Sequence, residues 1–194
     1  MDNVRLEIDG KTVTAEKGTT ILQAAREAGI NIPTLCNDER LAPYGVCRMC
    51  IVEITANNRT RLVTSCVYAV EEGLVVKTDT EKVRKIRRMI LELLLPLSPS
   101  GPLEDLAKQY GLEGSRFSTK ATNCILCGLC VRYCREIKKA NAIAFIGRGV
   151  DRKVAFLPEV APEVCPGCRE CFALCPSGKL VLDSLDGTYF PPPV

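Results

Sequence analysis

The chain reads CILCGLCVRYC over residues 124–134 and CPGCRECFALC over residues 165–175, and these two runs decide the fold of its C-terminal part. Both runs follow the spacing Cys-x2-Cys-x2-Cys-x3-Cys. In the bacterial form of this pattern each [4Fe–4S] cluster takes three cysteines from one run and the last cysteine of the other. The sequence therefore predicts two [4Fe–4S] sites, cluster one held by Cys124, Cys127, Cys130 and Cys175, and cluster two held by Cys165, Cys168, Cys171 and Cys134.

The residues around the two runs follow this pattern with two departures. The first is Arg135, which follows the first run where the pattern has a proline, and the second is Arg169. Pro176 closes the second run and ends its loop, because proline cannot donate a backbone hydrogen bond. Arg169 stands where such a loop often has a glycine, as the first run has at Gly128. We expect the stretches 142–146 and 154–157 to form a hairpin, inserted between the runs, that shields the clusters from water.

A third group of four cysteines follows a hairpin and a helix in the N-terminal part. Residues 4–8 alternate apolar and polar side chains, Asp9-Gly10 is a two-residue hairpin signal, and residues 11–14 return as the second strand. A helix over 18–28 comes next, and further strands are expected at 50–54, 61–65 and 74–78. This order of elements is that of a β-grasp ferredoxin. The sequence therefore predicts a [2Fe–2S] site held by Cys36, Cys47, Cys50 and Cys66.

Zinc is the alternative occupant, because four thiolates also make a tetrahedral zinc site. The hairpin and helix before the first tetrad favour [2Fe–2S], since zinc ribbons do not need them. Two ligand runs in register disfavour both zinc and disulfides in the other two sites. Gly45 lies in the first ligand loop, where it can adopt backbone angles that other residues resist.

Composition limits the class of protein and its compartment. The chain has 194 residues with 12 cysteines and no histidine, and its content of 46% hydrophobic and 25% charged residues is ordinary for a globular protein. The first residues show no basic stretch followed by an apolar run, and the apolar stretch 89–97 is far shorter than the roughly 20 residues that span a bilayer. We expect a cytoplasmic protein without a membrane span, whose reduced thiols bind metal.

The segment between the outer modules is expected to be helical. Residues 78–81 have the form of a capping box. The helix they open carries apolar residues that we expect in the core, with an interface as the alternative, namely Val83, Ile86, Met89, Ile90, Leu93 and Leu94. A basic run on this helix is interpreted as a solvated face, with a docking surface for an acidic partner as the alternative. It consists of Lys82, Arg84, Lys85, Arg87 and Arg88.

The net charge of +3 is not taken as a signal for nucleic acid. Residues 95–102 are expected to be a linker, followed by a short helix over 103–110.

These signals divide the chain into four parts. We expect a [2Fe–2S] β-grasp domain over 1–79, a helical connector over 80–118 and a tandem [4Fe–4S] domain over 119–182. The remaining residues, 183–194, are expected to be a tail that either frays or docks onto a partner.

Three stretches resemble a known family. They are Ile32–Cys36, Gly45–Glu53 and Cys130–Ile137, and they are similar to the NADH-dehydrogenase-type iron–sulfur subunits. That family includes the N-terminal region of the large peripheral subunit of respiratory complex I. It also includes small iron–sulfur subunits of NAD-linked or electron-bifurcating hydrogenases, formate dehydrogenases and transhydrogenases.

The resemblance covers roughly residues 1–182 and carries implications for fold and partners. It implies an α+β fold with an N-terminal β-grasp [2Fe–2S] domain, a helical connector and a C-terminal bacterial-type 2[4Fe–4S] domain. The implied partners are a flavin-containing, NAD(P)H-active subunit and a further redox subunit.

One feature of that family is missing here. The family usually carries an extra [4Fe–4S] cluster in the connector, held by three cysteines and one histidine. This chain has no cysteine between Cys66 and Cys124 and no histidine, although its residues 103–111 resemble the helix that follows that cluster. Electrons would therefore have to pass between the N-terminal and C-terminal clusters directly or through a partner.

The function predicted from these features is an electron relay without a catalytic residue. No dinucleotide fingerprint, phosphate loop or flavin motif is present, and all twelve cysteines are assigned as ligands. We therefore expect no substrate site, flavin or NAD in this chain. The alternatives are an iron–sulfur subunit of the succinate dehydrogenase or fumarate reductase type, an iron–sulfur sensor, and a structural zinc protein.

Overall fold

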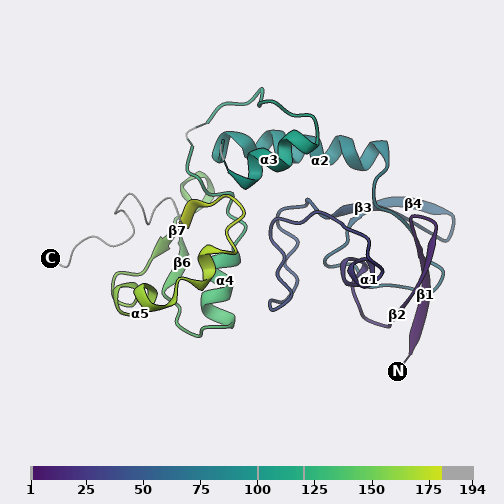
Figure 1. Ribbon diagram of the computed structural model, residues 1–194, viewed down its shortest axis with the longest axis horizontal. Coiled ribbons are helices and arrows are strands. Elements are labelled where there is room, and N and C mark those ends of the chain that lie inside the picture. The colour runs from purple at the N-terminus through teal and green to yellow at the C-terminus, as the bar shows by residue number, and fades with distance from the viewer. Residues whose placement is uncertain (1, 100, 120, 181–194) are drawn as a thin grey trace. The chain divides into compact units, whose positions relative to one another are not determined.

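The computed structural model describes residues 2–99, 101–119 and 121–180 (Figure 1). These residues form two compact units. Unit 1 contains the described residues up to Asn37 and Pro43–Ile90, and unit 2 contains Asp38–Ala42 and the described residues from Leu91 onward. The predicted tail, 183–194, lies outside the described residues.

Unit 1 is built on one mixed sheet of five strands in the order β2-β1-β5-β3-β4 (Figure 1). Neighbouring strands are antiparallel except β1 and β5, which are parallel. The strands are β1 Asn3–Ile8, β2 Lys11–Glu16, β3 Ile51–Ala56, β4 Arg59–Thr64 and β5 Val75–Lys77. The predicted hairpin and the three later strands are confirmed, with shifts of one or two residues at their ends.

The turn between β1 and β2 has the conformation that its sequence predicts. Asp9 and Gly10 have φ of 49° and 81°, as a two-residue turn with two left-handed residues requires. The Asp9 carboxylate also accepts hydrogen bonds from the Thr78 backbone N–H at 2.8 Å and from the Thr78 hydroxyl at 2.6 Å. The turn is thereby tied to the residue that follows β5.

Helix α1, Ile21–Glu27, packs its apolar face into the core of the sheet. Thr20 caps its first turn reciprocally with Gln23, because the Thr20 hydroxyl accepts from the Gln23 N–H and the Gln23 side chain accepts from the Thr20 N–H. The buried face consists of Ile21, Leu22, Ala24 and Ala25. The predicted helix is confirmed.

Helix α2, Glu81–Leu94, starts differently from the sequence prediction. Its cap is Thr80, whose hydroxyl accepts from the Val83 N–H at 3.2 Å, whereas Thr78 is held by Asp9. The prediction of a core stripe is correct for Val83 and wrong for Met89 and Leu93, which are 42% and 51% exposed. Sequence periodicity identifies one face of a helix but not how much of that face is covered.

Unit 2 consists of short elements around a second apolar core (Figure 1). Helix α4, Leu129–Glu136, packs against the antiparallel hairpin of β6, Ile143–Ile146, and β7, Lys153–Phe156. This hairpin confirms the predicted insertion between the two cysteine runs. The other elements are η1 Leu95–Leu97, α3 Pro102–Gln109, η2 Gly149–Asp151, α5 Ala161–Cys168 and η3 Glu170–Phe172.

None of the helices in the described ranges is long and apolar enough to cross a membrane.

Candidate metal centres

The first tetrad lies where the β3–β4 hairpin ends. Cys50 precedes β3 and Cys66 follows β4. The intervening Ser65 is fully buried and donates to the Cys50 carbonyl from its N–H at 3.1 Å and from its hydroxyl at 2.8 Å. Strand pairing therefore brings these two ligands together, although 15 residues separate them in the sequence.

The four thiols of this tetrad meet as two pairs. The Cys47 thiol contacts that of Cys36, whose sulfur also accepts from the Cys47 N–H at 3.4 Å. The Cys66 thiol contacts that of Cys50. No three Cys, Asp or Glu side chains in the described part of the chain stand together closely enough for one metal ion. Two pairs of thiolates are the donor set that two irons sharing bridging sulfides require, so the arrangement fits [2Fe–2S].

Hydrogen bonding and burial shift the pKa values of these thiols away from their ordinary value. The hydrogen bond from the Cys66 thiol lowers the pKa of Cys50 to about 6, and donating it raises the pKa of Cys66. The hydrogen bond to Cys36 and burial raise the pKa of Cys47. Ligation replaces the remaining protons, because only thiolates bind iron.

Arg87 supports this ligand loop, a role that the sequence did not predict. The interpretation of the basic run as a solvated face is wrong for Arg87, which is only 3% exposed. Its guanidinium donates to the carbonyl oxygens of Met49 at 3.1 Å and Ile51 at 2.7 Å, the residues on either side of Cys50. The one signal in the sequence is its place on α2, four residues after the buried Val83 and four before the buried Leu91.

The loop also contains left-handed backbone positions. Gly45 has φ of 69°, which agrees with the prediction made for it, and Arg48, between Cys47 and Cys50, has φ of 62°. A Cβ on residue 45 would come within 3.2 Å of the Val67 side chain. The loop is therefore sterically restricted at this glycine.

Unit 2 contains two cavities, each lined by cysteines of both runs. One is lined by Cys124, Cys127, Cys130 and Cys175. The other is lined by Cys134, Cys165, Cys168 and Cys171. Each set takes its fourth cysteine from the other run, and each is the donor set that one [4Fe–4S] cluster needs.

Local structure explains how the runs interleave. Helix α4 carries both Cys130 and Cys134, one turn apart, so a single helix delivers a thiol to each cavity. The hairpin contributes an apolar wall to each cavity, Ile143 from β6 to the one with Cys134 and Val154 from β7 to the other. This placement agrees with the shielding role predicted for the hairpin.

Burial and crowding act on the thiols of both cavities. Burial raises the pKa of Cys130, with Cys127 and Cys171 the largest charged contributors. Burial, together with Cys165 and Cys134, raises the pKa of Cys171 to about 12. Cluster assembly at both sites therefore releases protons.

One backbone N–H that the sequence did not identify donates a hydrogen bond to a ligand sulfur in unit 2. The Ala142 N–H donates to the Cys134 sulfur at 3.2 Å. The Ser177 hydroxyl donates its one proton to the Asn123 carbonyl at 2.8 Å, so its oxygen, 3.5 Å from the Cys175 sulfur, can only accept a hydrogen bond from that thiol. Hydrogen bonds donated to sulfur tune the reduction potential of iron–sulfur sites.

Arg169 adopts the conformation that its glycine counterpart would take. Its φ is 48°, and Gly128 at the equivalent place in the first run has φ of 78°. A side chain in the left-handed region costs roughly 1–2 kcal/mol. Arg169 also lines the cavity with Cys134.

Comparison with known proteins agrees with both modules. Residues 1–81 match a family described as a 2Fe-2S iron-sulfur cluster binding domain, and residues 123–179 match a 4Fe-4S dicluster domain. The chain is 36% identical to the NADPH-Fe(3+) oxidoreductase subunit alpha of Geobacter sulfurreducens, over 92% of this chain and 24% of that protein. It is 34% identical to the NADP-reducing hydrogenase subunit HndD of Solidesulfovibrio fructosivorans, over 93% of this chain and 36% of that protein.

A solved structure of similar fold is that of an NAD+-reducing [NiFe]-hydrogenase in the H2-reduced state. It has a TM-score of 0.68 and 29% identity, and the match covers 79% of this chain and 74% of the solved chain. The chain spans only about a quarter to a third of the length of the curated relatives it matches. Its two modules and these relatives confirm the predicted α+β fold and the predicted resemblance to the iron–sulfur subunits of NADH- and NADPH-linked oxidoreductases and hydrogenases.

Proposed function

We propose that this chain relays single electrons through one [2Fe–2S] and two [4Fe–4S] clusters. The bound clusters would supply the one-electron chemistry, while the chain holds the sulfur ligands, excludes water and donates N–H groups to sulfur. The observation that carries this proposal is the pair of cavities in unit 2, each lined by three cysteines of one run and one of the other.

The proposed ligand sets are those predicted from the spacing. Cys36, Cys47, Cys50 and Cys66 hold [2Fe–2S], and the pairing of their thiols supports this assignment. Cluster one takes the set with Cys175, and cluster two takes the set with Cys134. The segments 1–79, 80–118 and 119–182 would then be the [2Fe–2S] domain, the connector and the tandem [4Fe–4S] domain.

The proposed partners are a flavin-containing subunit that reacts with NAD(P)H and a further redox subunit. The names of the relatives, an NADPH-Fe(3+) oxidoreductase and an NADP-reducing hydrogenase, support this proposal. The described residues show no disulfide, and all twelve cysteines are free thiols. Their grouping as metal ligands is typical of a reducing compartment, for which the cytoplasm is our proposal.

Anaerobic purification with metal analysis and low-temperature EPR tests the relay. We expect about 10 irons per chain, divided as 2, 4 and 4. Dithionite should reduce all three sites, whereas NADH alone should reduce none until a flavoprotein partner is added. Zinc in place of iron, or a single type of cluster, would overturn the proposal.

A further inference from the structure

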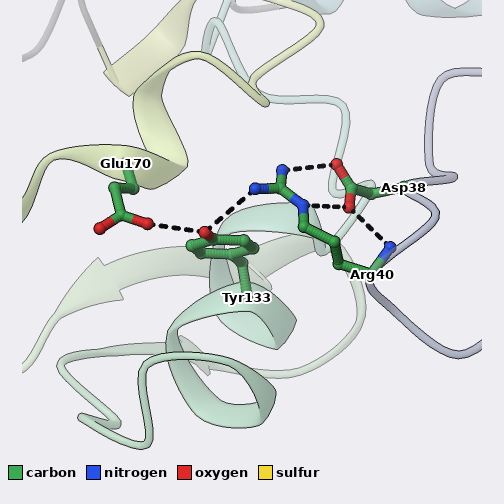
Figure 2. A network of polar contacts seen from close by, with 4 residues as sticks. All are labelled: Asp38, Arg40, Tyr133 and Glu170. Atoms are coloured by element: carbon green, nitrogen blue, oxygen red, sulfur yellow. Dashed lines mark hydrogen bonds and ion pairs between the residues drawn. The ribbon is translucent and has the colours of Figure 1, made fainter.

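Charged and polar side chains form a network that includes Asp38, Arg40, Tyr133 and Glu170 (Figure 2). Tyr133 and Lys138 line the cavity that contains Cys134. Tyr133 immediately precedes Cys134 on α4, and Glu170 immediately precedes Cys171 in η3. The network therefore joins two backbone segments that each carry a cysteine of this site.

The contacts form a continuous series. The Tyr133 hydroxyl donates to the Glu170 carboxylate at 2.7 Å, and the Lys138 ammonium pairs with the other Glu170 oxygen at 2.6 Å. Arg40 donates to the Tyr133 hydroxyl at 3.1 Å, and its guanidinium carbon lies 4.7 Å from the centre of the Tyr133 ring. The same guanidinium makes two hydrogen bonds of 2.8 Å to Asp38 (Figure 2).

Arg40 belongs to a short segment with several anchors in unit 2. This latch segment is Asp38–Ala42, which lies in the sequence between the ligands Cys36 and Cys47. Leu41 is 6% exposed and packs in the apolar core that includes Leu129 and Tyr133. The Arg132 guanidinium of α4 donates to the Ala42 carbonyl.

Three consecutive residues of the latch segment thus make three different kinds of contact. Arg40 makes a polar and cation–π contact, Leu41 an apolar one, and Ala42 accepts through its backbone. Tyr133 is only 3% exposed, so its hydroxyl depends on protein groups for its hydrogen bonds. Arg40 as donor and Glu170 as acceptor satisfy that hydroxyl in both roles.

We propose that Arg40 and Tyr133 are positioning residues for the second [4Fe–4S] site, and that the latch segment Asp38–Ala42 holds them in place. The Tyr133 hydroxyl joins the segments carrying Cys134 and Cys171, and Arg40 fixes the direction of that hydroxyl. Loss of either contact loosens the cysteines of cluster two and leaves those of cluster one unaffected. The proposal rests on the proposed function, since it requires the clusters to be present.

Variants of the latch segment can distinguish a positioning role of Arg40 from an effect of its positive charge on cluster two. Lysine keeps the charge of Arg40, but its single ammonium cannot form the planar fork that grips Asp38 while also reaching Tyr133. Leu41→Ala leaves every charge in place and removes only the apolar anchor. Arg135, also next to Cys134, is bonded only to the neighbouring Glu136 among the described residues, at 3.4 Å. Arg135→Gln is therefore the matched control for a loss of charge.

The test uses the full chain with all three clusters, in wild type and in Arg40→Gln, Arg40→Lys, Leu41→Ala, Tyr133→Phe and Arg135→Gln. Iron content is measured first. The hyperfine-shifted β-proton NMR signals of Cys134 and Cys171 then report cluster two, and those of Cys127 and Cys130 report cluster one. The rate at which each set disappears in the presence of an iron chelator is compared.

We expect Arg40→Gln, Arg40→Lys, Leu41→Ala and Tyr133→Phe to shift the signals of cluster two. They should also accelerate its loss about fivefold, the factor that corresponds to about 1 kcal/mol, the net worth of one hydrogen bond. Cluster one and Arg135→Gln should behave as wild type.

Three results would overturn this inference. They are unchanged cluster two in the four variants, full rescue by Arg40→Lys, and an equal effect of Arg135→Gln. Wild-type protein without about 10 irons would instead overturn the proposed function, so the two failures are distinguishable.

Discussion

Single residues decide which sulfur serves which site in unit 2. Cys175 closes the second run in the sequence but lines the cavity with the first three cysteines of the first run, and Cys134 does the converse. After Cys175 comes Pro176, which cannot donate a backbone hydrogen bond. The next residue, Ser177, donates from its hydroxyl to the carbonyl of Asn123, which directly precedes the first run.

This interleaving predicts a crossed effect of substitution. Cys175→Ala should remove the paramagnetic NMR signals of Cys127 and Cys130, and lower the iron content by about four per chain. Cys134→Ala should remove those of Cys165 and Cys171. Loss of the Cys165 signals in Cys175→Ala would contradict the proposed ligand sets.

Arg87 holds the first ligand loop through two hydrogen bonds to its backbone. Arg87→Met would leave the buried carbonyls of Met49 and Ile51 without their donor, at a cost of about 2–3 kcal/mol. We expect faster loss of the [2Fe–2S] EPR signal with a chelator, while the [4Fe–4S] signals persist. Arg88→Met, at an exposed position on the same helix, is the control and should behave as wild type.

At the scale of elements, the β6–β7 hairpin depends on one glycine. Gly147 has φ of 73°, and a Cβ there would lie 2.4 Å from the Asp151 carbonyl oxygen. Gly149 also has positive φ, 54°, but a Cβ there would meet nothing within 4 Å. A side chain at position 149 would therefore cause backbone strain alone, whereas one at position 147 would cause both strain and a steric clash.

We therefore expect Gly147→Ala to be more destabilising than Gly149→Ala. The second should lose only the roughly 1–2 kcal/mol of a left-handed side chain, and the first should lose more because Asp151 must move. Amide hydrogen exchange of β6 and β7 measures both. Equal protection in the two variants would show that the Asp151 carbonyl adjusts freely.

The Asp79–Arg84 ion pair at the start of α2 predicts a contribution to stability that does not change between pH 5.5 and pH 8. Arg84 lowers the pKa of Asp79 below its usual 3.8, mainly through a hydrogen bond. A carboxylate with a lowered pKa stabilises the fold above its unfolded pKa, and this contribution disappears only as the pH falls through the folded pKa. Between pH 5.5 and pH 8 the pair is fully formed.

Asp79→Asn should therefore increase amide exchange in the first turn of α2 by the same factor across that pH range. The factor should be small, because both side chains are more than one third exposed and solvent screens the pair. Arg84→Gln should match it. A difference between wild type and Asp79→Asn that shrinks between pH 8 and pH 5.5 would contradict the lowered pKa.

At the scale of the whole molecule, the two cores differ in how much they depend on metal. The core of unit 1 is mainly aliphatic, with Cys50 and Cys66 as its cysteines. The core of unit 2 contains Cys134, Cys165 and Cys171, and further cysteines pack against it. Removing iron should therefore affect the two units unequally, because metal binding is coupled to folding where ligands form the core.

We expect chelation of all iron to leave amide protection in β1 and β3 and to remove it from β6 and β7. Hydrogen exchange of the apoprotein, compared with the holoprotein, measures this difference. Reconstitution with iron and sulfide should restore protection in unit 2. Equal loss of protection in both units would show that the sheet of unit 1 also needs its cluster to fold.

Much of the fold followed from local chemistry. The Asp9-Gly10 turn, the helix that Thr20 caps, the later strands and the inserted hairpin were all predicted, because each depends on residues adjacent in the chain. The predicted capping box at 78–81 does not form, because Thr78 forms its hydrogen bonds with Asp9, which is distant in the sequence, and Thr80 caps the helix instead.

The sequence alone determined the predicted ligand sets, because the spacing within each cysteine run is typical of one kind of cluster, and that pattern also assigns the last cysteine of each run to the other cluster. Only the tertiary structure decided that Arg87 is buried under the first ligand loop, that Met89 and Leu93 are exposed, and that Asp38–Ala42 packs with α4. These features depend on which distant groups approach a residue, and no local pattern encodes that. The latch segment is the clearest case, since nothing in its five residues indicates the Tyr133 hydroxyl that it contacts.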